Sequence, residues 1–201
     1  MTPLAKLAFL SLLLVSANIP LVAKTHRLDL SIGGVELENP DSFRKIFRNL
    51  KLDWEGSMPE GVLRLSDAKQ KKTLYFIFHP GSLTDSVAEA EVVELGQKGL
   101  SDEMLHGSAN LVGDYNIRLP DLVSEKGIRL GLTEKQVVDI LGKPNKRIAS
   151  SKGIKLFYQE DINLETETDE TLKAINMPFY YGEYEFEKGH LKRFAFGFEY
   201  P

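Results

Sequence analysis

Apolar residues recur at helical spacing in a short segment beyond the middle of the chain. Val137, Ile140 and Leu141 follow Thr133 at intervals that place them on one face of a helix. Thr133 and Gln136 have the residue types of a capping box, in which each side chain bonds to the backbone of the other residue. The glycine and proline that follow the last apolar position suit the end of a helix. The pattern therefore predicts a short helix that begins directly after Thr133.

A second segment, upstream, repeats this spacing. Phe43, Ile46 and Phe47 lie on one helical face, with Asn39 as a candidate N-cap and Pro40 as the first helical residue. Helices this short are not stable alone. The apolar face of each helix therefore needs a partner surface elsewhere in the chain.

Strand-like stretches follow both helices and can supply that surface. They alternate between apolar and polar residues, or are apolar throughout, and turn residues separate them. The predicted strands are residues 61–65, 73–79 and 87–95 after the first helix, and residues 154–159, 180–187 and 191–200 after the second. We therefore predict an α+β fold of two tandem units, each with a short helix packed on a small three-stranded antiparallel sheet. The first unit spans residues 24–99, a linker spans 100–126, and the second unit spans 127–201.

The N-terminal residues 1–23 have the layout of a secretory signal peptide. Lys6 precedes an apolar run, and small residues then allow cleavage after Ala17 or Ala23. The alternative is an uncleaved membrane anchor. The chain has no cysteine, so it has neither disulfides nor the acylated cysteine of a bacterial lipoprotein. We expect a periplasmic or secreted protein without a lipid anchor, and without a transmembrane helix once the signal is removed.

The alternation of the strands separates two faces of each predicted sheet. In residues 73–79, one face has Leu74, Phe76 and Phe78, while Tyr75 and His79 lie on the other. The corresponding free face of the second unit includes Tyr181, Glu183, Glu185 and Arg193. Tyrosines with a few charges suit recognition of a protein partner, and such residues should not be needed for folding. The alternative is that this face packs the two units against each other.

Few residues offer catalytic or metal-binding chemistry. The sequence lacks the nucleophile elbow, the zinc-protease motif and the phosphate loop. A hydrolytic pair could form from His79 and Ser82, although a structural role for a histidine at a strand end is the simpler interpretation. Acidic residues at 161–170 resemble the start of a calcium loop, but Thr166 and Leu172 replace its glycine and its last glutamate. We expect no cofactor and no metal ion. The formal net charge of −4 also argues against a nucleic-acid partner.

The helix around Thr133 carries a resemblance to a known family. Gly131, Leu132, Thr133, Gln136, Val137, Leu141, Gly142 and Pro144 resemble the G-M-T-x-x-Q-V-x-x-x-L-G-x-P pattern of the BamE (SmpA/OmlA) domain family, with leucine in place of methionine. Two such units in an exported chain also resemble the tandem layout of β-lactamase inhibitory proteins. The resemblance implies a helix on a three-stranded sheet, and a role in binding or assembly rather than in catalysis.

These patterns lead to one functional hypothesis with two alternatives. The hypothesis is an exported, non-enzymatic module that binds a protein partner in the periplasm or cell envelope through the free face of its sheet. The first alternative is a scaffold subunit that acts in envelope assembly. The second is a hydrolase with a dispersed histidine and serine site.

Overall fold

The computed structural model describes residues 28–53, 60–79, 86–107 and 109–199. The predicted signal peptide lies outside these residues. The strands are β1 Ser31–Ile32, β2 Val35–Glu36, β3 Gly61–Asp67, β4 Lys72–Phe78, β5 Glu89–Glu94, β6 Asn110–Asn116, β7 Lys146–Ser150, β8 Gly153–Asp161, β9 Phe179–Glu187 and β10 His190–Glu199. The helices are α1 Pro40–Phe47, α2 Leu100–His106, α3 Glu134–Leu141 and α4 Glu170–Ile175. None of the helices in the described ranges has the length and apolar character needed to cross a membrane.

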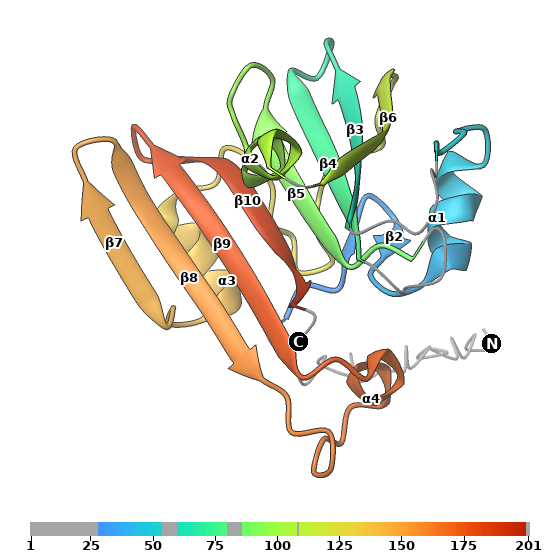
Figure 1. Ribbon diagram of the computed structural model, residues 1–201. Coiled ribbons are helices and arrows are strands. Elements are labelled where there is room, and N and C mark those ends of the chain that lie inside the picture. The colour runs from blue at the N-terminus through green and yellow to red at the C-terminus, as the bar shows by residue number, and fades with distance from the viewer. Residues whose placement is uncertain (1–27, 54–59, 80–85, 108, 200–201) are drawn as a thin grey trace, which may run out of the picture.

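Eight of the strands form one continuous sheet in the order β6-β3-β4-β5-β10-β9-β8-β7 (Figure 1). All neighbours are antiparallel except β6, which runs parallel to β3. The prediction of two separate three-stranded sheets is therefore wrong. The two predicted groups of strands join where β5 pairs with β10, from Arg193 opposite Val93 to Gly197 opposite Glu89.

Burial explains why β5 and β10 pair. Five of the six β5 residues are buried, including Glu89 and Glu91 on the face opposite Ala90 and Val92. A strand buried on both faces is a poor edge strand, because an edge leaves a row of backbone N–H and C=O groups unpaired. Pairing with β10 satisfies these groups and makes the sheet continuous.

Two strands of this sheet were not predicted from the sequence. Strand β6 lies within the segment expected to be a linker, where Gly113 and Asp114 suggest a turn. Gly113 instead lies inside the strand, beneath an aromatic ring: a Cβ added there would lie 2.7 Å from the ring of Tyr115 and 2.9 Å from Leu63. Strand β7 lacks an alternating pattern, and all five of its residues are exposed.

Helices α1 and α3 cover the same face of the sheet, which we call the inner face. Phe43 and Phe47 of α1 pack their rings against Phe76, and Phe43 also packs against Phe78. On α3, Val137 and Leu141 are buried in the same apolar core. Burial of these α3 positions was predicted and is confirmed. The remaining apolar position of each stripe, Ile46 or Ile140, is 39% exposed, so each helix buries only part of its predicted stripe.

The residues that resemble the BamE pattern fix the ends of α3. The Gln136 N–H donates to Thr133 Oγ1 at 3.3 Å, and the Thr133 N–H donates to Gln136 Oε1 at 2.9 Å, so the predicted capping box is confirmed. The Gly131 N–H donates to Leu191 O at 2.8 Å, and this bond ties the start of the motif to β10. At the other end, the Tyr158 hydroxyl donates to Gly142 O at 2.9 Å. These residues therefore have a structural role in seating α3 on the sheet.

Candidate binding surface

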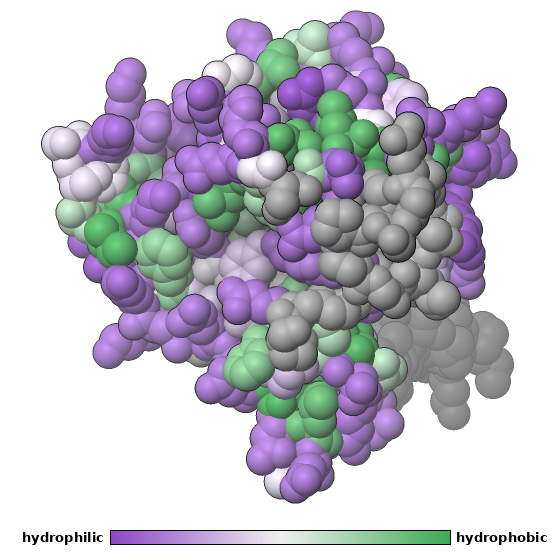
Figure 2. Space-filling view, in the orientation of Figure 1, coloured by the Kyte–Doolittle hydropathy of each residue, from purple (hydrophilic) through white to green (hydrophobic). Residues whose placement is uncertain are grey.

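The outer face of the sheet, opposite α1 and α3, is covered unevenly. Helix α2 packs on the part of it formed by β3, β4 and β5, while no described helix lies in front of β7, β8 and β9 (Figure 1). We call this uncovered part the open face. It consists of Lys146 and Ile148 from β7, Lys155, Phe157 and Gln159 from β8, and Phe179, Tyr181, Glu183 and Glu185 from β9. Figure 2 shows a mixture of polar and apolar surface over these strands.

The open face combines charge with exposed apolar groups. Phe179 is 43% exposed and Ile148 is 39% exposed. Lys155 bridges Glu183 and Glu185, with Nζ 3.3 Å from Glu183 Oε1. Aromatic and apolar groups surrounded by charged ones are typical of protein interfaces.

A buried ionic cluster supports the open face from β10. Arg193 is 4% exposed, and its Nη1 donates to Glu183 Oε1 at 2.7 Å and to Glu185 Oε1 at 2.6 Å. Its Nε donates to Glu91, which is 1% exposed. Burial lowers the pKa of the guanidinium, but Glu91 and Glu183 more than offset this effect, so the pKa is raised overall. The prediction placed Arg193 on an exposed face, and the structure corrects this to a buried residue that holds three carboxylates together.

Glu91 links this cluster to α2. The Leu100 N–H donates to Glu91 Oε1 at 2.8 Å, and the Ser101 N–H donates to Glu91 Oε2 at 2.9 Å. The carboxylate therefore caps the first turn of α2 from the sheet, where an N-cap side chain would usually act. Gly99 makes this approach possible, since a Cβ at that position would lie 2.6 Å from the Glu91 oxygens.

A second polar cluster lies nearer the other end of the same face. Glu89 is 8% exposed, with one oxygen 2.6 Å from His79 Nε2 and the other accepting from the Tyr181 hydroxyl. Burial lowers the pKa of His79, but the contacts with Glu89 and with Glu60 outweigh burial and raise it. Burial and Glu89 raise the pKa of Tyr181 well above its usual range, so its hydroxyl stays a neutral donor.

The structure separates the residues predicted for partner binding into two groups. Tyr181, Glu183 and Glu185 lie together on the open face and are partly buried. Tyr75 does not reach this face, because it is 3% exposed under α2 and its hydroxyl donates to Asp102 at 3.0 Å. The idea that Tyr75 faces either a partner or the other unit is therefore wrong, since α2 covers it. The side chain of His79 is only 9% exposed and lies against Glu89.

Two grooves border the open face at its ends. One has a volume of about 350 Å³ and lies between the start of α2 and the β7–β8 turn. Its lining has charges of both signs, from Lys98, Lys152, Lys155, Glu103, Glu185, Glu187 and Arg193. The other, of about 250 Å³, includes Gln159, Phe179 and other residues of the open face. Sequence reasoning missed the contributions of β7 and β8 to this surface. Lys155, Phe157 and Gln159 alternate with apolar residues along β8, and this alternation could have indicated that they lie on the outer face.

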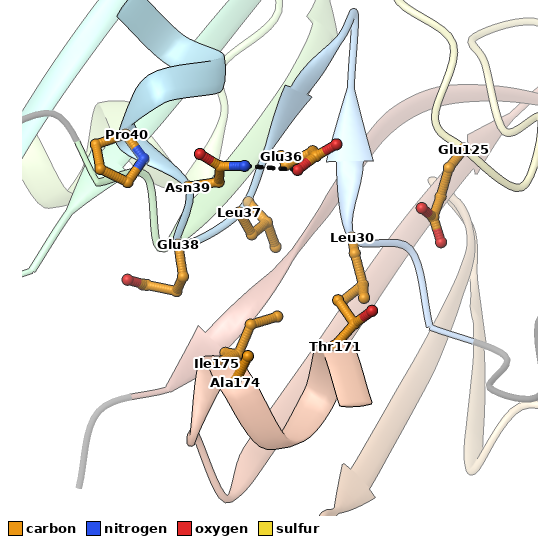
Figure 3. Close-up of a pocket in the computed structure, with 10 residues that line it drawn as sticks. All are labelled: Leu30, Glu36, Leu37, Glu38, Asn39, Pro40, Glu125, Thr171, Ala174 and Ile175. Carbon is orange, nitrogen blue, oxygen red and sulfur yellow. Dashed lines mark hydrogen bonds between the residues drawn. The ribbon is translucent and has the colours of Figure 1, made fainter. Parts of the chain in front are cut away.

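A further cavity of about 380 Å³ lies away from the open face, between β2 and α4 (Figure 3). It is lined by Leu30, Glu36, Leu37, Glu38, Asn39, Pro40, Glu125, Thr171, Ala174 and Ile175. Two of its acidic side chains accept hydrogen bonds within the fold: the Asn39 amide donates to Glu36 at 2.7 Å, and the Ser86 hydroxyl donates to Glu38 at 2.7 Å. Across the described ranges, no three histidine or acidic side chains are placed to hold a metal ion.

Comparison of the chain with protein-family models, with curated proteins and with solved structures finds no match. The predicted hydrolytic partner of His79, Ser82, lies outside the described residues. The open face is therefore the candidate site that the geometry defines best.

Proposed function

We propose that this protein is an exported, non-enzymatic module that binds a protein partner through the open face of its sheet. Export is inferred from residues 1–23, which have the charge, apolar run and small residues of a signal peptide. The observation that carries the binding proposal is the open face itself. It presents exposed apolar side chains on strands that no described helix covers, while α1, α2 and α3 cover much of the rest of the sheet.

The ionic cluster beneath the open face supports this proposal. Arg193 is bonded to Glu183 and Glu185 and is largely buried, so the charged side chains of β9 are held in place before any partner arrives. Binding to an ordered surface loses less conformational entropy than binding to a mobile one. Phe179 and Ile148 then provide exposed apolar area that a partner can bury.

A photocrosslinking experiment tests the proposal. A benzophenone amino acid placed at Gln159, an exposed position on the open face, should give a discrete adduct with a protein in periplasmic extract. The same group at Lys69, an exposed position in the β3–β4 turn, should not. Identical adducts from both positions, or an adduct from Lys69 alone, would contradict the proposal. Mass spectrometry of the adduct separates two roles: a soluble enzyme indicates an inhibitor, and an outer-membrane component indicates an assembly scaffold.

A further inference from the structure

Strand β7 forms one edge of the eight-stranded sheet and has a free side. Within the described part of the chain, its backbone pairs only with β8, from Lys146 opposite Phe157 to Ser150 opposite Gly153. The other edge, β6, is partly closed, because the Asp53 N–H donates to Val112 O at 2.8 Å and the Tyr115 hydroxyl donates to Lys51 O. In an antiparallel pair, about half of the N–H and C=O groups of an edge strand point away from its neighbour. Strand β7 can therefore accept another strand, whereas β6 is less open to one.

The segment that forms this edge is basic in sequence. From Lys143 to Gln159 the sequence has five basic residues and no acidic residue, in a chain whose formal net charge is −4. Arg147 pairs with Glu134 of α3 at 2.6 Å, and Lys155 pairs with the carboxylates of β9. Lys146 lies 5.9 Å from the centre of the Phe157 ring. Neither Lys146 nor Lys152, at the two ends of the β7–β8 hairpin, forms an ion pair within the described residues. An acidic segment would be attracted to this edge.

The same charge disfavours pairing of β7 with a second copy of the chain. Two β7 strands side by side would place a basic hairpin beside another basic hairpin, and charge of the same sign on both partners opposes association. Ile148 lies between these charges on the outer face and is 39% exposed. A strand laid beside β7 would place an apolar residue next to Ile148 and an acidic residue next to Lys146, two positions that share the outer face.

We propose that β7 is the docking edge for an extended acidic segment of the protein partner, which adds to the sheet as a further strand. This inference rests on the proposed function and names the chemistry of the partner. Backbone hydrogen bonds to the free side of β7 provide the affinity, as in other cases of strand addition to a sheet edge. The basic residues and Ile148 provide the selectivity.

Synthetic peptides test the docking edge directly. A short fluorescent peptide of glutamate, valine and threonine should bind the full chain, and its affinity should fall with rising salt concentration. The same peptide with lysine in place of glutamate should bind at least about tenfold more weakly. A version with N-methyl groups on alternate backbone nitrogens keeps the charge but loses pairing, and it should also bind at least about tenfold more weakly. Hydrogen exchange at the β7 amides should slow when the acidic peptide is present.

Charge-reversal variants locate the binding edge. The double substitution Lys146→Glu and Lys152→Glu should lower the affinity for the acidic peptide by about tenfold or more. The matched control, Lys45→Glu and Lys69→Glu, changes the net charge equally on exposed positions away from β7 and should leave the affinity within about twofold. Equal binding of the N-methylated and unmodified peptides, or equal loss in both double variants, would overturn the proposal. Dimerisation of the chain through β7 would also overturn it. A failure here with a positive crosslink at Gln159 would leave the proposed function standing.

Discussion

Arg193→Met should lower the free energy of unfolding by about 3–5 kcal/mol. Arg193 is 4% exposed and pairs with Glu91, Glu183 and Glu185. Its removal leaves Glu91, which is 1% exposed, without its cation. Methionine retains much of the apolar stem, so the loss of packing is small. Chemical denaturation in urea, followed by circular dichroism, measures the effect.

Lys155→Met is the matched control for this prediction. Lys155 also contacts Glu183 and Glu185, but its side chain is 45% exposed, so water screens the interaction. Exposed ion pairs contribute about 0–1 kcal/mol, and we expect a loss within that range. Adding Glu183→Gln to Arg193→Met should recover part of the lost stability, because it removes one of the three negative charges around the missing guanidinium. Equal losses for Arg193→Met and Lys155→Met would show that the cluster is not buried as described.

Asp29→Asn should stabilise the protein by about 3 kcal/mol at pH 7.5. Asp29 is fully buried beside Tyr180, and its Oδ1 accepts from the Lys126 N–H at 3.0 Å. Ser124 also hydrogen-bonds to the carboxylate, whereas Oδ2 has no partner within the described residues. Burial raises its pKa from 3.8 to about 6. Because the pKa of Asp29 is higher in the folded state than in the unfolded state, protonation of Asp29 stabilises the fold. This stabilisation is complete below about pH 4 and is lost as the pH rises through 6. Asparagine keeps an acceptor oxygen and never acquires the charge.

The difference between Asp29→Asn and the parent protein should therefore depend on pH. It should be largest above pH 6 and should shrink towards zero near pH 4, in urea unfolding measured at each pH. Asp67→Asn is a control of opposite sign. Backbone N–H groups of Gln70 and Leu119 lower the pKa of Asp67, so its removal should destabilise the protein at neutral pH and matter less as the pH falls. A constant difference across this pH range for Asp29→Asn would contradict the assignment of a buried, charged carboxylate.

Local sequence patterns predicted most of the elements correctly. The starts of α3 and α1 were predicted from the capping box of Thr133 and Gln136 and from Asn39 and Pro40. These signals depend only on neighbouring residues, so they can be recognised in the sequence. The predicted strands of both groups are also present, since their alternation follows the backbone period.

The joining of these strands into one sheet could not be read from local pattern. Glu89 and Glu91 alternate with Ala90 and Val92, which normally indicates a solvent-exposed face. Their charges are instead balanced by distant residues: Glu91 pairs with Arg193, which lies 102 positions later in the sequence. Strand β7 was missed for a different reason. An exposed edge strand has no buried side, so burial imposes no alternation on its sequence.

The candidate site was predicted only in part. The alternation of β9 placed Tyr181, Glu183 and Glu185 on one face, and they lie together in the structure. The burial of Arg193 was missed because the two groups of strands were expected to form separate sheets, whereas β10 pairs with β5 on one side and with β9 on the other. Tyr75 was misassigned because α2, which covers it, comes from the segment that was expected to be a linker.

The central claim is tested most directly by measuring how tightly the partner identified by crosslinking binds the Phe179→Ala variant. Phe179 is 43% exposed on the open face, so its truncation should change stability by no more than about 0.5 kcal/mol. Leu111→Ala is the matched control, since Leu111 is 44% exposed on β6 at the far edge of the sheet. Titration calorimetry should show that Phe179→Ala reduces the free energy of binding to the partner by about 2 kcal/mol. Leu111→Ala should leave this binding free energy unchanged. An unchanged affinity for Phe179→Ala, or an equal loss in both variants, would contradict binding through the open face.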